Sequence, residues 1–308
     1  MTAAADQRPR AGLAAAGVAV TLWGTTSVLI KQVDDITPLA VACYRVWMGA
    51  ALVTIIHLAR GGRVSLLLLR RCFLGGLAFA ADLILFFYAV NHTSVANASV
   101  IGALQPVLVV LVSARLFGEH PVRSEILWGM VAIVGVVLVV AGGDAGGANG
   151  TSGNLLAVGA LVAWTGYFVA TKHARQGLSS LEFIVGMSLV AALLTAPLPL
   201  LVPGTLANTD AHGWAIVVAL TLLNGVIAHQ LAIWAHGHIS LLTMSLMTLA
   251  IPVGAAAAGA IFIDEPLTLL QVGGMVIVLG ALALVTIASA RRSPAEVDAE
   301  LDAIGATP

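Results

Sequence analysis

The sequence predicts an all-α integral membrane protein of ten transmembrane helices, arranged as two inverted five-helix repeats with both termini in the cytoplasm. Three observations lead to this expectation. Of the 308 residues, 59% are hydrophobic and only 9% are charged, whereas an ordinary soluble domain has roughly 25% charged residues. The apolar residues gather in ten long stretches, and motifs of the first half of the chain return in the second half.

Each apolar stretch is long enough to cross a membrane, because a hydrocarbon core of about 30 Å requires roughly 20 helical residues. We expect spans at 12–32, 38–59, 72–91, 94–117, 124–142, 153–173, 180–202, 213–235, 240–263 and 267–289. The first span is too long for the core of a signal peptide and lacks a small-residue cleavage site, so we expect it to be retained.

The distribution of basic residues predicts the orientation, since Lys and Arg concentrate in cytoplasmic loops. With the N-terminus inside, twelve of the 14 basic residues fall on the cytoplasmic side, Lys31 falls on the outer side, and Arg45 lies within the second span. We therefore expect a multi-pass protein of the bacterial plasma membrane with both termini cytoplasmic.

The two halves of the chain are related by an internal duplication. A tryptophan stands eight residues before a lysine in Trp23–Lys31 and again in Trp164–Lys172, 141 residues later. Because one unit has five spans, an odd number, the second copy crosses the membrane in the opposite sense, as in transporters with inverted repeats. The expected divisions are a first repeat at 12–142, a Gly-rich linker at 143–152, a second repeat at 153–289 and a polar cytoplasmic tail at 290–308.

Several motifs of this unit resemble the EamA repeat of the drug/metabolite transporter superfamily. The first half contains "TPLAVACYRVWMGA", "YAVNHTSVANASVIGALQPV", "FGEHP" and "WGMVAIVG", and the second half keeps "IPV" and "IDEPLT". The resemblance covers about residues 12–289. It implies ten helices and secondary transport of small metabolites, often export, without defining the substrate. Arg45 fits the family pattern, but the matching stretch of the second half, "SSLEFIVGMSL", has no arginine.

Asp82 is the carboxylate nearest the middle of an expected span. A charge at this depth costs roughly 2.5–3.5 kcal/mol on insertion scales, so it needs a reason. One interpretation is a group that couples protons or binds a substrate ammonium in an aqueous cavity. The other is a carboxyl that burial keeps neutral, or one that hydrogen-bonds a neighbouring helix.

The fourth span combines polar side chains with a proline. Asn97 and Gln105 are eight residues apart, about 80° around a helix, so they can share a face that lines a cavity; alternatively they bond neighbouring helices. Pro106 leaves the carbonyl of Gly102 without its usual donor. We expect Pro106 and its counterpart Pro252, 146 residues later, to break their helices and to act as hinges.

Further cavity candidates lie deep in the first spans of both repeats and in the eighth span. Trp23, Trp164 and Tyr167 can stack on an organic substrate or pack the repeats together, and anchoring at lipid headgroups is the competing explanation. His229 can carry protons near neutral pH or act as a structural residue. Asn224 lies about 140° around the same helix from His229, so these two do not share a face.

Three charged residues are candidates for gates or structural ion pairs. Arg45 either pairs with Asp34 or Asp35 in the outer loop or binds an anionic group of a substrate. Glu119 and Glu265 follow the two proline-bearing spans on opposite membrane faces, where each caps the next helix or takes part in a gate ion pair.

We therefore expect a secondary active transporter that exports a small metabolite, such as an amino acid, by alternating access through a midplane cavity. A drug or toxic-compound exporter and a metabolite uptake permease remain open as alternatives. The expected partners are a small-molecule substrate and the lipid bilayer but no nucleic acid, and the expected state is a monomer or homodimer.

An intramembrane enzyme is a remote alternative. The sequence lacks the paired aspartates of a protease, a Ser–His arrangement at a suitable spacing, and a helix motif with enough metal ligands. We expect no enzymatic activity, no metal and no cofactor, while proton coupling stays open.

Overall fold

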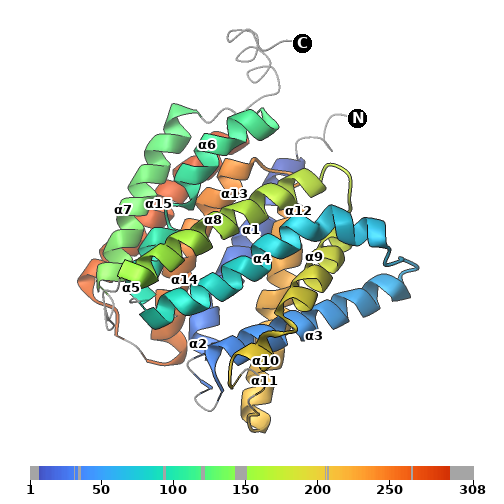
Figure 1. Cartoon of the computed structure of the whole chain (residues 1–308). Helices are drawn as coiled ribbons and strands as arrows, with labels where there is room; N and C mark the ends of the chain where they lie inside the picture. The colour runs from blue at the N-terminus through green and yellow to red at the C-terminus, as the bar shows by residue number, and fades with distance from the viewer. Residues whose placement is uncertain are drawn as a thin grey trace.

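Helices form all the regular structure in the part of the chain that the computed structural model describes, and no strand occurs there (Figure 1). The described residues are 7–291 apart from 31, 34–35, 93–94, 119–121, 143–150, 205, 207 and 265. The elements are α1 (Gln7–Gly24), α2 (Thr26–Ile30), α3 (Pro38–Ala59), α4 (Leu66–His92), α5 (Val95–Gly102), α6 (Gln105–Phe117), α7 (Arg123–Gly142), α8 (Thr151–Ala174), α9 (Ser180–Thr195), α10 (Leu198–Leu201), α11 (Ala211–Ala219), the π-helix η1 (Leu220–Ala228), α12 (His229–Ala235), α13 (Leu241–Met247), the 3-10 helix η2 (Thr248–Ala250), α14 (Ile251–Phe262) and α15 (Leu269–Arg291).

Within the described residues, nine helical stretches are long and apolar enough to cross a membrane, which makes the chain a multi-pass membrane protein. They are Pro9–Ile30, Leu39–Ala59, Ala98–Phe117, Arg123–Gly142, Thr151–Ala174, Ser180–Leu201, Ala211–Ala235, Leu241–Phe262 and Leu269–Ile287. Each coincides with a span expected from the sequence. The remaining expected span, 72–91, lies inside α4, a continuous helix of 27 residues that is not among the nine.

Side-chain caps determine where several helices begin. The hydroxyl of Thr37 accepts a hydrogen bond from the backbone at the start of α3, and Ser240 does the same for α13. Ser179 and Glu182 form a reciprocal capping box on α9, and a carboxylate oxygen of Asp210 accepts from α11 at 2.7 Å. These contacts satisfy N–H groups that have no partner within their own helix.

The fourth and ninth spans are both interrupted just before a proline. α5 ends at Gly102 and α6 begins at Gln105, while the ninth span passes through η2 between α13 and α14. Pro106 and Pro252 therefore lie in the first turn of the helix that follows. The missing proline N–H removes no helical hydrogen bond there, which explains how an apolar span tolerates the residue.

Small residues bring helices from the two halves of the chain into close contact. A Cβ atom on Gly24 of α1 would lie 2.8 Å from the Cα atom of Gly254 in α14. A Cβ atom on Gly135 of α7 would lie 2.9 Å from the carbonyl oxygen of Gly274 in α15. Close backbone packing of this kind holds helices together in lipid, where the hydrophobic effect between helices is absent.

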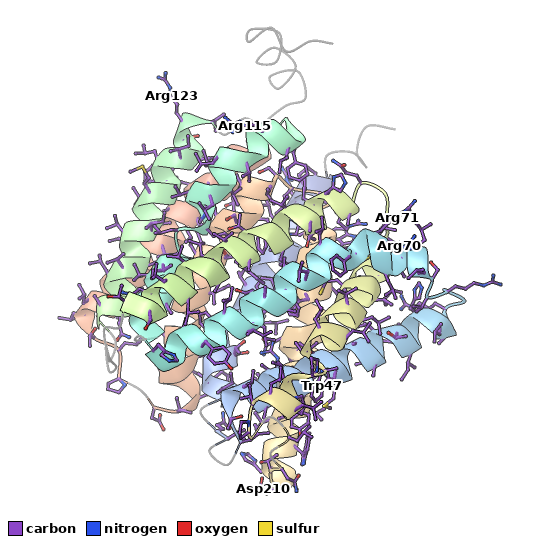
Figure 2. All side chains as sticks on the ribbon, in the orientation of Figure 1. Trp47, Arg70, Arg71, Arg115, Arg123 and Asp210 are labelled. Atoms are coloured by element: carbon purple, nitrogen blue, oxygen red, sulfur yellow. The ribbon has the colours of Figure 1, made fainter. Side chains whose placement is uncertain are left out.

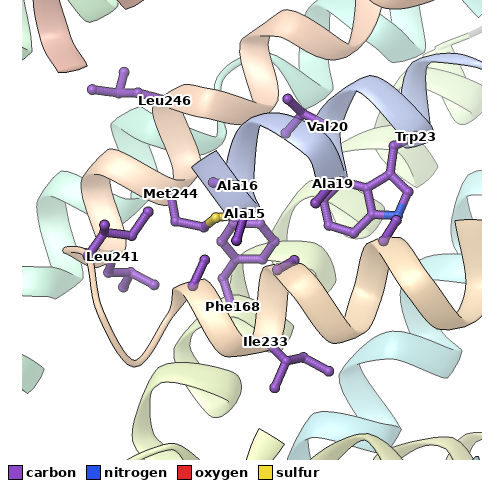
Figure 3. Close-up of a cluster of buried hydrophobic side chains, with 14 of the residues drawn as sticks. Ala15, Ala16, Ala19, Val20, Trp23, Phe168, Ile233, Leu241, Met244 and Leu246 are labelled. Carbon is purple, nitrogen blue, oxygen red and sulfur yellow. The ribbon is translucent and has the colours of Figure 1, made fainter. Parts of the chain in front are cut away.

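α1 runs through the middle of the bundle, where it contacts α12, α13, α14 and η1. α7 packs against α15 at one side, and α4 lies along α8 and α9 (Figure 1). A buried cluster surrounds the middle and last turns of α1, including Ala16, Phe168, Ile233 and Met244 (Figure 3). Apolar side chains also cover the outside of the bundle, as expected for a surface in lipid; Leu269, for example, is 92% exposed.

Charged residues are distributed unevenly between the two ends of the bundle. Arg70, Arg71, Arg115 and Arg123 lie toward one end, and Asp210 lies at the other (Figure 2). We call these the arginine end and the Asp210 end.

Candidate functional site

Two adjoining chambers lie between helices from both halves of the chain. The larger has a volume of about 390 Å³ and is lined by α1–α4, α8, α9, η1, α12 and α14. The smaller has a volume of about 300 Å³ and lies among α4, α5, α8, η2 and α14. Asp82, Phe86, Trp164 and Ile251 line both chambers and therefore mark their junction.

Arg45 of α3 and Asp82 of α4 place a guanidinium and a carboxyl group in the larger chamber. Neither side chain forms an ion pair or hydrogen bond with any described residue, and Arg45 Nε is buried without a partner. Asp34 and Asp35, the expected partners of Arg45, lie outside the described residues. In its ionised form each group needs compensation, which water or a bound molecule in the chamber can supply.

Aromatic rings form one wall of the larger chamber. Trp23 and Trp164, which occupy equivalent places in the two halves of the sequence, meet with ring centroids 5.7 Å apart at an angle of 71°. Phe79 and Phe86 of α4 line the same chamber. Rings of this kind offer broad apolar contact to an organic molecule, and their faces attract cations.

His229 lines the larger chamber and is held in place by Tyr167. Its Nδ1 and the Tyr167 hydroxyl are hydrogen-bonded at 3.1 Å. Tyr167 itself is only 1% exposed, lines neither chamber and stacks on Trp164 at 5.1 Å. The tyrosine therefore lies behind the wall and orients the side chains that form it, which differs from its expected place in the lining.

Asn224 lies in η1, a π-helical segment, and its side chain is fully buried without a hydrogen-bond partner. The neighbouring Gly225 reaches the larger chamber instead. The backbone carbonyl of Asn224 accepts a hydrogen bond from Trp23 Nε1 at 3.3 Å. Asn224 thus differs from the expectation that its amide lines the cavity, and it contributes through the backbone to the position of the Trp23 ring.

Gln105 also differs from its expected place, because it is 1% exposed and lines neither chamber. Its Oε1 accepts a hydrogen bond from the hydroxyl of Thr248 at 3.3 Å. This contact joins the two interrupted spans beside their breaks, and it is Thr248 and Pro252 that line the smaller chamber. The structure thus favours the other interpretation of Gln105, a bond between neighbouring helices.

Some expected site residues cannot be placed at side-chain level. Asn97 belongs to α5, but its side chain lies outside the described part of the structure, as do Glu119 and Glu265 altogether. Their roles as cavity or gate residues remain predictions. Within the described residues, no group of three or more His, Cys, Asp and Glu side chains is placed to hold a metal ion.

Sequence reasoning missed Phe79 and Phe86, which flank Asp82 at intervals of three and four residues. This spacing places all three side chains on one face of α4, as their shared chamber shows. Gly49 of α3 stands in the same relation to Arg45, four residues on, and lines the chamber too. These lining residues could therefore have been found from the sequence, because each lies three or four residues from Arg45 or Asp82 and so shares its helix face.

Near the arginine end, basic side chains bind backbone carbonyls in the last turn of the eighth span and just after it. Lys172 Nζ donates to the carbonyl of Ile239 at 2.7 Å, and Arg175 Nε donates to that of Ile233 at 3.2 Å. His236, which follows the eighth span directly, is 1% exposed. Burial, together with the charges of Lys172 and Arg175, lowers the pKa of His236 to about 3.

The fold is shared with a solved protein structure, and the sequence matches a known family. A profile of the EamA-like transporter family matches the chain twice, over residues 10–141 and 151–287. A crystal structure aligns with a TM-score of 0.78 and 23% sequence identity, covering 92% of this chain and 98% of that chain. At this identity the structural match concerns the fold alone.

Two similar proteins are bacterial exporters. The aromatic amino acid exporter YddG of Ancylobacter novellus is 28% identical over 211 residues, which cover 66% of this chain and 71% of that protein. The pseudopaline exporter CntI of Pseudomonas aeruginosa is 25% identical over 289 residues, which cover 89% of this chain and 96% of that protein.

Proposed function

This chain belongs to the EamA-like transporter family, and we propose that it is a secondary active transporter that exports a small metabolite, such as an amino acid, by alternating access. The observation that carries the proposal is the larger chamber, which is lined from both halves of the chain and contains two charges without a described partner. Transporters with inverted repeats bind their substrates near the midplane, where the repeats meet.

The proposed architecture has ten spans, with α4 as the third, in two inverted repeats. Each match to the family profile covers one expected repeat. The contact between Trp23 and Trp164 supports an axis between the repeats at the chamber. The arginine end, with Arg115 and Arg123, is assigned to the cytoplasm by the positive-inside rule, which places both termini there (Figure 2).

Packing on the two sides of the chamber supports alternating access. The cluster around Ala15, Ala16 and Ala19 fills the bundle along the middle turns of α1, whereas Trp23, near the end of α1, borders the chamber (Figure 3). We assign this arrangement to a form closed toward the cytoplasm. Rearrangement at the breaks before Pro106 and Pro252 would then expose the chamber to the other side.

The lining of the chamber supports a small organic substrate. Its described lining combines one arginine, one aspartate and His229 with aromatic and aliphatic side chains. Sugar phosphates and nucleotide sugars would require several basic groups. The two exporters named above carry an aromatic amino acid and pseudopaline, and cargo of this size is what we propose here.

The apolar aromatic wall also supports a second candidate function, the export of hydrophobic drugs or toxic compounds. Uptake of a metabolite would use the same chamber in the opposite direction, and an intramembrane enzyme is the remote alternative. Asp82 and His229 are the lining groups through which proton coupling would operate.

Counterflow in proteoliposomes tests the proposal. Vesicles containing the purified protein are preloaded with a single amino acid, and uptake of the same labelled compound is followed over a panel of amino acids and cationic drugs. Saturable counterflow is expected for at least one compound. Ala42→Phe, which places a ring in the larger chamber, should abolish this counterflow, whereas Ala51→Phe, on the exposed side of the same helix, should not. Absence of saturable counterflow for every compound would contradict the proposal.

A further inference from the structure

We propose that Arg45 and Asp82 select the substrate by its two charges, with Arg45 binding a carboxylate and Asp82 binding an ammonium group of the same molecule. The apolar remainder of the molecule would occupy the smaller chamber. This inference rests on the proposed transport function and names the class of substrate as a zwitterionic amino acid with a large apolar side chain.

The first argument is that the two charges share a chamber without neutralising each other. A structural ion pair would bring the guanidinium and carboxylate within 4.0 Å, and the structure gives no such pair between these described residues. Arg45 Nε is buried and has no hydrogen-bond partner among the described residues. An ionised guanidinium and an ionised carboxylate held apart in an apolar space are costly unless a ligand satisfies both.

The second argument concerns the helices that carry the charges. α3 and α4 each pack extensively against α9, but they contact each other little. Met187 and Ser188 of α9 line the chamber between them. Arg45 and Asp82 therefore project from two separately supported helices, and a molecule that binds both must bridge from one helix to the other.

The third argument is the position of Asp82 at the junction of the chambers. An ammonium group at Asp82 places the α-carbon of an amino acid at this junction. The carboxylate then points into the larger chamber, toward Arg45, and the side chain points into the smaller one. The smaller chamber has a volume of about 300 Å³, and its lining includes the small apolar residues Ala103, Ala157 and Ala160. It can therefore hold a bulky apolar group.

The test compares three compounds that differ only in charge, namely phenylalanine, phenethylamine without the carboxylate, and 3-phenylpropionate without the ammonium group. A second set, leucine, isopentylamine and 4-methylpentanoate, replaces the aromatic ring by an aliphatic chain. Binding is measured as competition against counterflow in proteoliposomes. A charge-assisted hydrogen bond corresponds to about a tenfold to hundredfold change in affinity, so in each set the wild type should prefer the amino acid by about that factor.

Two variants separate the roles of the charges. Arg45→Met should lose the preference for phenylalanine over phenethylamine but keep the preference over 3-phenylpropionate. Asp82→Asn should show the reverse. Arg45→Lys, which restores a cation, should recover part of the preference for the carboxylate. Arg123→Met, exposed at the arginine end, should behave as the wild type. Size-exclusion profiles identify variants that fail to fold. If Arg45→Met or Asp82→Asn fails, the inference is judged from Arg45→Lys and from the preference of the wild type for the amino acid.

The outcomes distinguish the two levels of the proposal. If the amine or the acid of either set competes with wild-type counterflow as well as or better than the amino acid, the two-charge inference is overturned while transport stands. Equal loss of all three compounds in a folded Arg45→Met also overturns it. If no compound shows counterflow, the proposed function fails together with the inference.

Discussion

Replacing Tyr167 by phenylalanine should destabilise the protein through one hydrogen bond behind the chamber wall. The Tyr167 hydroxyl and His229 Nδ1 lie 3.1 Å apart, and the two residues are 1% and 4% exposed. Phenylalanine keeps the ring that stacks on Trp164 at 5.1 Å, so packing is retained. A net hydrogen bond contributes about 1 kcal/mol, and leaving a buried partner unsatisfied costs about 1–3 kcal/mol. We therefore expect a loss of about 1–3 kcal/mol, seen as a fall of several °C in melting temperature.

The assay is thermal unfolding of the purified protein in detergent, followed by intrinsic fluorescence, for Tyr167→Phe, His229→Leu and the double variant. Because the two side chains act through one bond, the double variant should be more stable than the sum of the single effects predicts, by about 0.5–1.5 kcal/mol. Additive effects, or an unchanged melting temperature for Tyr167→Phe, would refute the assignment of a stabilising bond. Export should also show a higher KM, since His229 would lose its fixed orientation.

Three further variants test packing, helix breaks and pH dependence. Gly135→Ala should lower the melting temperature because its Cβ would lie 2.9 Å from the Gly274 carbonyl, whereas Gly280→Ala, with open space around it, should not. Pro252→Ala should cost less than about 1 kcal/mol, because a proline in the first turn breaks no helical hydrogen bond, yet it should slow counterflow if the break moves during transport; unchanged flux would argue against a hinge. The lowered pKa of His236, about 3, means that protonation opposes folding. Stability is complete above about pH 6.5 and falls as the pH drops toward 3, so His236→Leu should reduce the difference in melting temperature between pH 7 and pH 5, and an undiminished difference would exclude this histidine as its cause.

The boundaries of the spans were predictable because hydropathy and helix breaks are local properties of the chain. The seventh span was expected at 180–202 and the structure has Ser180–Leu201 as an apolar helical stretch. Pro106 and Pro252 indicated the interruptions of their spans, since proline fits the first turn of a helix but not its interior. The third span is the exception, because α4 is continuous but is not among the nine apolar stretches.

The candidate site was predictable in part. Asp82, Arg45, Trp23, Trp164 and His229 all line the larger chamber, and each had been singled out as a polar or aromatic side chain deep in a span. A charged residue within a span indicates a place in the chamber lining, because a charge that faces lipid is costly.

Neutral amides carry no such indication, since they can hydrogen-bond a neighbouring helix as readily as a substrate. Gln105 does so with Thr248, and Asn224 is buried in η1, where Trp23 bonds its backbone.

The sequence by itself determined that the chain is a multi-pass membrane protein of the EamA-like transporter family, where its spans lie, and which charges lie within them. Only the tertiary structure decided which faces of those spans meet in a chamber, because a helix that is apolar on every side has no polar stripe to show its orientation. That orientation depends on contacts between distant segments. Gly24 against Gly254 and Gly135 against Gly274 bring helices of the two halves together, and α4, which packs along α8 and α9, presents Phe79 and Phe86 to the chamber.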